Sequence, residues 1–172
     1  KLTLHLTLER EEARNILKKI AGGEYNNSQV SSFLTVYMMR MITVHELAGF
    51  RDALLDLCFA VDLSEFDTID LCGTGGDGKN TFNISTLSSF VVAGAGGKVA
   101  QHGNYGVSSS CVCINVMEDL GYKGTNNRDS LRNQLEKANI CFLHAPLFHP
   151  AMKTVAPIRR ELSVKTFFNM LG

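Results

Sequence analysis

The segment with the clearest chemical character is a glycine-rich run that begins at Asp70 and reads Asp-Leu-Cys-Gly-Thr-Gly-Gly-Asp-Gly. Four of the residues 73–78 are glycines, which adopt positive φ values and let the backbone come close to a ligand. Successive backbone N–H groups in such a turn form a concave anion site. Asn83, Ser85 and Thr86 follow at the expected start of a helix, where free N–H and hydroxyl groups favour phosphate. The run therefore predicts a phosphate-binding loop.

Other uses of a glycine-rich loop fit this run less well. A plain turn from strand to helix needs none of the polar residues that follow. The nucleotide P-loop is excluded because no Gly-Lys-Ser/Thr occurs here. Gly73, Gly75 and Gly78 have the spacing of a dinucleotide-binding loop, but the later acidic residue that would bind a ribose is missing.

Two more polar segments follow later strands. Residues 101–110 read Gln-His-Gly-Asn-Tyr-Gly-Val-Ser-Ser-Ser, and residues 144–153 read His-Ala-Pro-Leu-Phe-His-Pro-Ala-Met-Lys. Ligands of an open parallel sheet bind at the carboxyl ends of its strands, so we expect these segments to line one crevice with the glycine run. Phe148, His149 and Arg159 together suit a flat aromatic carboxylate. The plainer alternative makes His149 a helix-cap residue and Arg159 a solvated helix residue.

The elements that must position these residues fall into two groups. Before residue 63 we expect three amphipathic helices. The first carries apolar residues at i, i+3, i+4 and i+7 from Ala13 and is capped by Thr7, the second starts near Asn27, and the third starts with a Thr43–Glu46 capping box. Beyond residue 63, strand and helix patterns alternate, which predicts an α/β domain with a mainly parallel sheet. The expected strands are 68–72, 98–101, 140–143 and 165–168, and the expected helices are 86–95, 115–120, 130–138 and 151–161.

The predicted organisation is therefore a small helical domain, residues 1–63, followed by the first part of an α/β domain, residues 64–172, truncated at its C-terminal end. Seventeen basic residues balance seventeen acidic ones, which argues against a general nucleic-acid binder. Five cysteines at irregular spacing indicate free thiols in a reducing cytoplasm rather than a disulfide framework. The longest apolar stretch, residues 90–97, is too short to cross a bilayer, so no membrane association is expected.

Taken together, these stretches resemble the anthranilate phosphoribosyltransferases. The resemblance runs over essentially the whole chain, matches the N-terminal half of that family, and is carried by residues 73–78, 81–86, 102–104, 145–153, 155–162 and 168–172. It implies a homodimer joined through the helical domain and a reaction in which the anthranilate amine attacks the ribose of phosphoribosyl pyrophosphate, while Mg²⁺ neutralises the pyrophosphate that leaves. No covalent nucleophile is expected, because positioning and charge stabilisation can do most of this work.

The resemblance also implies two sets of binding residues. Those for phosphoribosyl pyrophosphate are Gly73, Thr74, Gly75, Gly76, Asp77, Asn83, Ser85, Thr86, Gln101, His102, Gly103, Ser108 and Ser109. Those for anthranilate are Gly73, His102, Asn104, Ala145, Pro146, His149 and Arg159. Ser85 would also contact one Mg²⁺ ion, whose other ligands are expected beyond Gly172.

The chain departs from the family pattern at three places. Gln101 stands where the family usually has a lysine that neutralises pyrophosphate, Tyr105 replaces a common arginine, and Cys111-Val-Cys113 replaces small residues. With the second half missing, little or no transferase activity is expected of these 172 residues alone. A pyrimidine nucleoside phosphorylase is the alternative enzyme, although its pattern differs over residues 145–162. A catalytically degenerate nucleic-acid-binding relative is favoured by Gln101 and opposed by the balanced charge.

Overall fold

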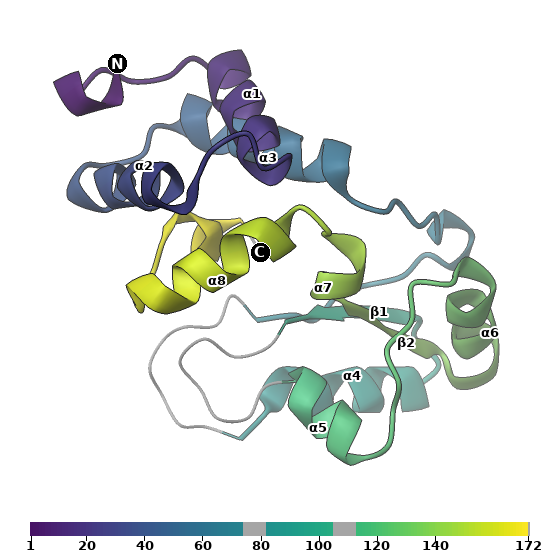
Figure 1. Ribbon diagram of the computed structural model, residues 1–172. Coiled ribbons are helices and arrows are strands. Elements are labelled where there is room, and N and C mark those ends of the chain that lie inside the picture. The colour runs from purple at the N-terminus through teal and green to yellow at the C-terminus, as the bar shows by residue number, and fades with distance from the viewer. Residues whose placement is uncertain (74–81, 105–112, 172) are drawn as a thin grey trace. The chain divides into compact units, whose positions relative to one another are not determined.

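The computed structural model describes residues 1–73, 82–104 and 113–171 (Figure 1). Contacts divide the chain into two compact units. The first, here called the helical unit, comprises Lys1–Cys58 together with His149–Gly172, and the second, here called the strand unit, comprises Phe59–Phe148. This division differs from the expected boundary at residue 63, because the last segment of the chain packs with the N-terminal helices.

The helical unit contains the three expected helices and the expected late one. They are α1 (Arg10–Ala21), α2 (Asn27–Met39), α3 (Val44–Leu57) and α8 (Met152–Leu162), with short 3-10 helices at Leu2–Leu4 and Phe167–Met170. The Thr43–Glu46 capping box is confirmed, because the Thr43 N–H donates to Glu46 Oε2 at 3.0 Å and the Glu46 N–H donates to Thr43 Oγ1 at 3.2 Å. The predicted Thr7 cap is wrong, since α1 starts after Glu9, whose N–H donates to Glu12 at 2.9 Å.

The predicted strand at 165–168 is also wrong. Residues 167–170 form a 3-10 helix, and the adjacent Phe167 and Phe168 are both buried in one core. Phe167 stacks on Phe50 of α3 with the ring centroids 4.4 Å apart. Successive side chains of a strand point to opposite faces, so only a helical turn brings both rings into the same core.

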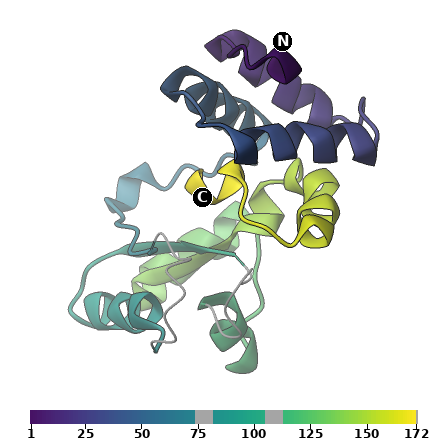
Figure 2. The same ribbon diagram turned by 90° about the vertical axis from the view of Figure 1, so that its left-hand side faces the viewer.

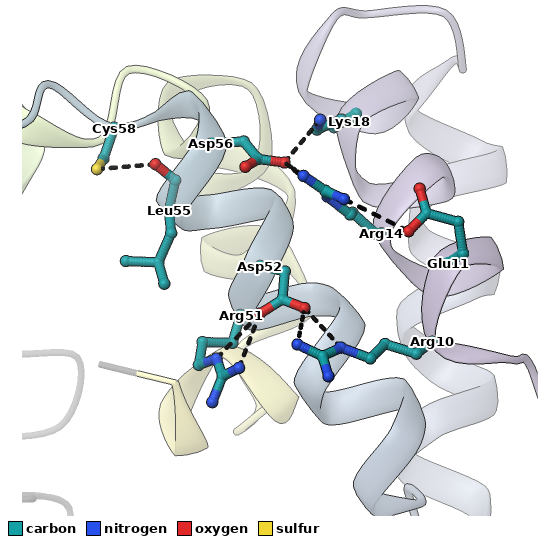
Figure 3. Close-up of polar contacts among 9 residues, drawn as sticks. All are labelled: Arg10, Glu11, Arg14, Lys18, Arg51, Asp52, Leu55, Asp56 and Cys58. Atoms are coloured by element: carbon teal, nitrogen blue, oxygen red, sulfur yellow. Dashed lines mark hydrogen bonds and ion pairs between the residues drawn. The ribbon is translucent and has the colours of Figure 1, made fainter.

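Helices α1 and α3 pack closely and are joined by ion pairs. A Cβ atom added at Gly49 of α3 would lie 2.1 Å from the backbone oxygen of Arg10, so only glycine allows this approach. Figure 3 shows basic residues of α1 facing carboxylates of α3 along the same contact. The Arg10 Nε donates to Asp52 at 2.6 Å, and the Arg14 Nε donates to Asp56 at 2.6 Å.

A buried carboxylate organises the other end of this bundle. The Glu46 side chain is fully buried and accepts hydrogen bonds from the Leu8 N–H at 2.9 Å and the Tyr37 hydroxyl at 3.0 Å. Both terminal nitrogens of Arg40 also donate to it, one at 3.0 Å and the other at 2.5 Å. Glu46 thereby connects the N-terminal segment, α2 and α3.

The strand unit has a parallel pair of strands. They are β1 (Val99–Gly103) and β2 (Ile140–His144), with Val99 aligned to Ile140 and Gly103 to His144. Ile69 pairs with Val99 through one parallel bridge, which is all that the structure forms of the predicted strand at 68–72. The helices are α4 (Ile84–Gly94), α5 (Cys113–Asp119), α6 (Arg128–Ala138) and α7 (Ala145–Phe148), with a 3-10 helix at Ser64–Phe66.

Side chains of the two strands alternate between two apolar clusters. Val99, Ile140 and Phe142 pack with α4 and α5, and Ala100 and Cys141 pack with α6. Helices α4 and α5 lie on the same side of the strands in both views (Figures 1 and 2). The strands are therefore covered on both faces, as the predicted α/β class requires. In the described part of the chain, no helix is long and apolar enough to cross a membrane.

Candidate functional site

The segments after the strands begin at one edge of the strand unit. Because β1 and β2 are parallel and in register, the chain leaves both strands at the aligned pair Gly103 and His144. Asn104 and Ala145 come directly after these two residues. The segment after Ile69 runs in the same direction, since its bridge to Val99 is parallel. Ligands of open parallel sheets bind at this edge.

The described end of the glycine run lies against the start of α4. A Cβ atom added at Gly73 would lie 3.2 Å from Ser85 Oγ, so glycine lets the backbone come close to this hydroxyl. Several other predicted ligands lie outside the described residues: Thr74, Gly75, Gly76, Asp77, Ser108 and Ser109. The variant positions Tyr105, Cys111 and Val112 lie outside them as well.

Asn83 and Thr86 form the polar start of α4. The Thr86 hydroxyl donates to Asn83 Oδ1 at 2.8 Å, and Thr86 itself is buried. The hydroxyl has one hydrogen to give, so in this arrangement Thr86 supports Asn83 and does not donate to a ligand. Asn83 Nδ2 is buried and has no hydrogen-bond partner among the described residues. This donor, at the N-terminal end of a helix, can serve an anion.

Next to Gly73 the structure places a charged pair. Asp70 Oδ2 contacts His102 Nδ1, and Asp70 Oδ1 accepts a hydrogen bond from the Cys72 N–H at 2.9 Å. A hydrogen bond with the Cys72 side chain, followed by the bond with Asp70, raises the pKa of His102 to about 9 although burial opposes this. His102 is therefore an imidazolium at neutral pH. The sequence analysis did not assign Asp70 a role. Its position at the end of a predicted strand, just before the glycines, could have indicated that it belongs to the site.

Gln101 points away from His102. It is 1% exposed and its Oε1 lies 2.7 Å from Ser89 Oγ of α4. Side chains of neighbouring strand residues point to opposite faces, so residue 101 faces α4 while residue 102 faces the other side. Gly103 is buried at the end of β1, and Asn104 is exposed just beyond it.

The residues predicted for anthranilate are divided between the two units. Ala145 and Pro146 are partly buried in α7 of the strand unit, whereas His149 and Arg159 belong to the helical unit. The Arg159 Nη2 donates to Asn169 Oδ1 at 3.1 Å, and its guanidinium lies 5.1 Å from the centre of the Phe168 ring. Burial lowers the pKa of Arg159.

Within residues 1–73, 82–104 and 113–171, no three His, Cys, Asp or Glu side chains gather as they would around a metal ion. The predicted ligand Ser85 is partly buried beside Gly73. A hydroxyl oxygen is a ligand that Mg²⁺ accepts, usually with carboxylates, water or substrate phosphates completing the shell.

Comparison with known proteins agrees with this architecture. Residues 65–172 match the family described as "Glycosyl transferase family, a/b domain", and residues 1–58 match "Glycosyl transferase family, helical bundle domain". The chain therefore belongs to this glycosyl transferase family, which confirms the predicted combination of helical and α/β parts.

Within that family, the chain is similar to anthranilate phosphoribosyltransferases. It is 67% identical to the one of Flavobacterium psychrophilum and 61% identical to the one of Bacteroides fragilis, in each case over 100% of this chain and 52% of the relative. The crystal structure of the Thermus thermophilus enzyme matches with a TM-score of 0.88 at 35% identity, over 100% of this chain and 52% of that one.

The Saccharomyces cerevisiae enzyme in complex with PRPP and Mg matches with a TM-score of 0.85 at 30% identity, over 96% of this chain and 50% of that one. The predicted resemblance is thus confirmed. The chain spans about half the length of the curated relatives that it matches.

Proposed function

We propose that this chain is part of an anthranilate phosphoribosyltransferase of tryptophan biosynthesis. The enzyme would transfer phosphoribose from phosphoribosyl pyrophosphate to the anthranilate amine and release pyrophosphate. The observation that carries the proposal is the similarity to such enzymes over the whole chain. The polar start of α4 beside Gly73 supports it, because Asn83 Nδ2, a buried donor without a partner among the described residues, lies where a diphosphate is expected.

Phosphoribosyl pyrophosphate would bind at the glycine run. Asn83 Nδ2 is a buried donor, and the ion pair of His102 with Asp70 lies at the same strand end. Fixed donors and charges of this kind stabilise the charge that develops as pyrophosphate leaves. No residue of this chain is assigned a covalent role. The reaction needs the two substrates to be held in attack geometry, and positioning supplies much of the rate.

A magnesium ion belongs to the same proposal. One structure of the similar yeast enzyme is a complex with both PRPP and Mg. When bound, Mg²⁺ would neutralise charge on the leaving pyrophosphate. Ser85 is the residue of this chain proposed to hold it, through its hydroxyl oxygen.

Arg159 is proposed to bind the anthranilate carboxylate. Its guanidinium is partly buried and, among the described residues, makes no ion pair with a carboxylate. A desolvated cation of this kind gains most from an anionic ligand, and a guanidinium matches a carboxylate with paired hydrogen bonds. Asn104, Ala145, Pro146 and His149 remain predicted anthranilate residues through the family resemblance.

A homodimer through the helical unit is proposed from exposed apolar side chains. Met39, Met41 and Val44 lie around the connection of α2 and α3 and are 79%, 91% and 82% exposed. Contiguous exposed apolar residues commonly mark an interface.

A reducing compartment such as the cytoplasm is proposed from the free thiols of Cys58, Cys72 and Cys141.

Calorimetric titration of the chain with phosphoribosyl pyrophosphate and Mg²⁺ tests the proposal. We expect binding that is weakened by Ser85→Ala and unchanged by Ser88→Ala, which removes a nearby hydroxyl from the same helix. Phosphorolysis of thymidine by the chain would favour the phosphorylase alternative, and salt-dependent binding of DNA would favour the nucleic-acid-binding one. Absence of binding to phosphoribosyl pyrophosphate would count against the transferase.

A further inference from the structure

The surroundings of Arg159 differ from those of Arg40, another partly buried arginine of the helical unit. Arg40 is 12% exposed at its side chain and is paired with the buried carboxylate of Glu46. Arg159 is held instead by a neutral group, since its Nη2 donates to the amide oxygen of Asn169 at 3.1 Å. Its Nε is buried and has no hydrogen-bond partner in the part of the chain that the structure describes. The charge of Arg159 therefore remains available.

Asn169 is itself fixed in place. Its Oδ1 accepts a second hydrogen bond, from the Thr166 N–H at 3.1 Å, and its own N–H donates to the Thr166 carbonyl at 3.0 Å. The preceding residues, Phe167 and Phe168, are buried in the core of the helical unit. The amide oxygen thus comes from a turn anchored by two aromatic rings.

The same turn supplies the surface beside the guanidinium. The Phe168 ring centre lies 5.1 Å from the guanidinium carbon of Arg159, within the range of a cation–π interaction. The ring and the amide oxygen restrict the orientation of a side chain that otherwise has many rotamers. A guanidinium that is oriented before binding loses less entropy when it binds a carboxylate.

We propose that Asn169 is a positioning residue for carboxylate recognition: it orients Arg159 through a neutral oxygen, so that the guanidinium keeps its charge for the carboxylate of the acceptor substrate. This inference rests on the proposed function and deepens it. An aspartate at position 169 could accept the same two hydrogen bonds from Arg159 and Thr166. It would also neutralise Arg159 and compete with the substrate carboxylate.

The substitution Asn169→Asp therefore separates positioning from a structural role. A structural role requires only the acceptor oxygen, so N169D would leave binding unchanged. The positioning role predicts that N169D keeps the thermal midpoint at or above that of the wild type and weakens acceptor binding by about tenfold or more, the usual effect of losing one charge-assisted hydrogen bond.

Fluorine NMR of 4-fluoroanthranilate, the ligand in another structure of the yeast enzyme, measures this binding in the 172-residue chain. The variants are N169D, N169A, R159A and the double variant R159A/N169D. Arg160→Ala is the matched control, since Arg160 is the exposed neighbour in the same helix. We expect R159A and N169D to weaken binding, R160A to leave it unchanged, and the double variant to match R159A, because residues that act as one unit are not additive. 4-Fluoroaniline lacks the carboxylate, so neither R159A nor N169D should change its binding.

Each other outcome is decisive. Wild-type affinity in N169D, or additive losses in the double variant, would overturn the inference while leaving a carboxylate site at Arg159 intact. If N169D does not fold, N169A takes its place and must show the same non-additivity with R159A. Wild-type protein that does not bind 4-fluoroanthranilate would overturn the proposed function and the inference together.

Discussion

Replacing Glu46 by Gln tests the buried polar network that joins the helices of the helical unit. Glu46 accepts six hydrogen bonds, from the Leu8 N–H, the Tyr37 hydroxyl, two Arg40 nitrogens, and the N–H and hydroxyl of Thr43. In Glu46→Gln one oxygen becomes an NH₂ group, which must face other donors. Arg40, whose side chain is 12% exposed, loses its counter-charge at the same time.

Leaving one partner of a buried ion pair alone costs about 3–5 kcal/mol. For a chain of this size each kcal/mol lowers the thermal midpoint by about 2–4 °C, so E46Q should melt roughly 6–20 °C below the wild type. Circular dichroism with thermal unfolding measures the difference. The control is Glu11→Gln, which removes a 67% exposed carboxylate that lies 3.4 Å from Arg14, and we expect little change because exposed pairs contribute little.

The deficit of E46Q should also depend on pH. Burial alone would raise the pKa of Glu46, but hydrogen bonds from Arg40, Thr43 and Leu8 lower it to about 2 from an ordinary 4.5. A carboxylate with a lowered pKa stabilises the fold above its unfolded value, and this stabilisation is lost as the pH falls towards 2. The difference in urea midpoint between wild type and E46Q should therefore shrink between pH 4.5 and pH 2. A midpoint equal to that of the wild type at pH 6, or a deficit independent of pH, would refute this account of the network.

Three further substitutions test the packing and electrostatics of the two units. Asp70→Asn should lower the pKa of His102 from about 9, which NMR titration of the imidazole ring would measure. The stabilisation from a raised histidine pKa is complete below its ordinary 6.5 and is lost as the pH rises through 9. An unchanged titration would contradict the pairing. Gly73→Ala should weaken calorimetric binding of phosphoribosyl pyrophosphate, because its Cβ would lie 3.2 Å from Ser85 Oγ; wild-type affinity would show that this approach is unimportant. Gly49→Ala should lower the free energy of unfolding, measured with urea, by about 3 kcal/mol, because its Cβ would lie 2.1 Å from a backbone oxygen of α1. An unchanged urea midpoint would rule out the close helix contact.

Local patterns predicted most of the elements. The helical periodicity and the Thr43–Glu46 capping box located α3 because their causes lie within a few residues of one another. The strand prediction at 165–168 is wrong because adjacent apolar aromatic residues resemble a strand in sequence. The orientation of Phe167 depends on Phe50, which is far away in the chain. Only the folded core decides between a strand and a turn there.

For the candidate site, too, the sequence predicted local features but not contacts between distant residues. Spacing and residue type identified Asn83, Ser85 and Thr86 as the polar start of a helix, and the structure confirms that start at α4. The sequence could not show that Thr86 supports Asn83, nor that Asp70 pairs with His102, because residues 70 and 102 meet only when separate segments of the sheet lie side by side. Glu46 was predicted only as a helix cap, since its bond to the Leu8 N–H spans 38 residues.

The departure at Gln101 bears on the choice between a transferase and a nucleic-acid-binding relative. Gln101 faces the interior and its amide is bonded to Ser89 of α4, so a glutamine in place of the lysine that the resemblance implies does not alter an exposed basic surface. Binding to a phosphate backbone needs clustered basic side chains in solvent. A single small diphosphate needs fewer charges, and the buried Asn83 Nδ2 at the start of α4 offers it a neutral donor. The buried position of Gln101 is therefore compatible with the proposed phosphoribosyl pyrophosphate site.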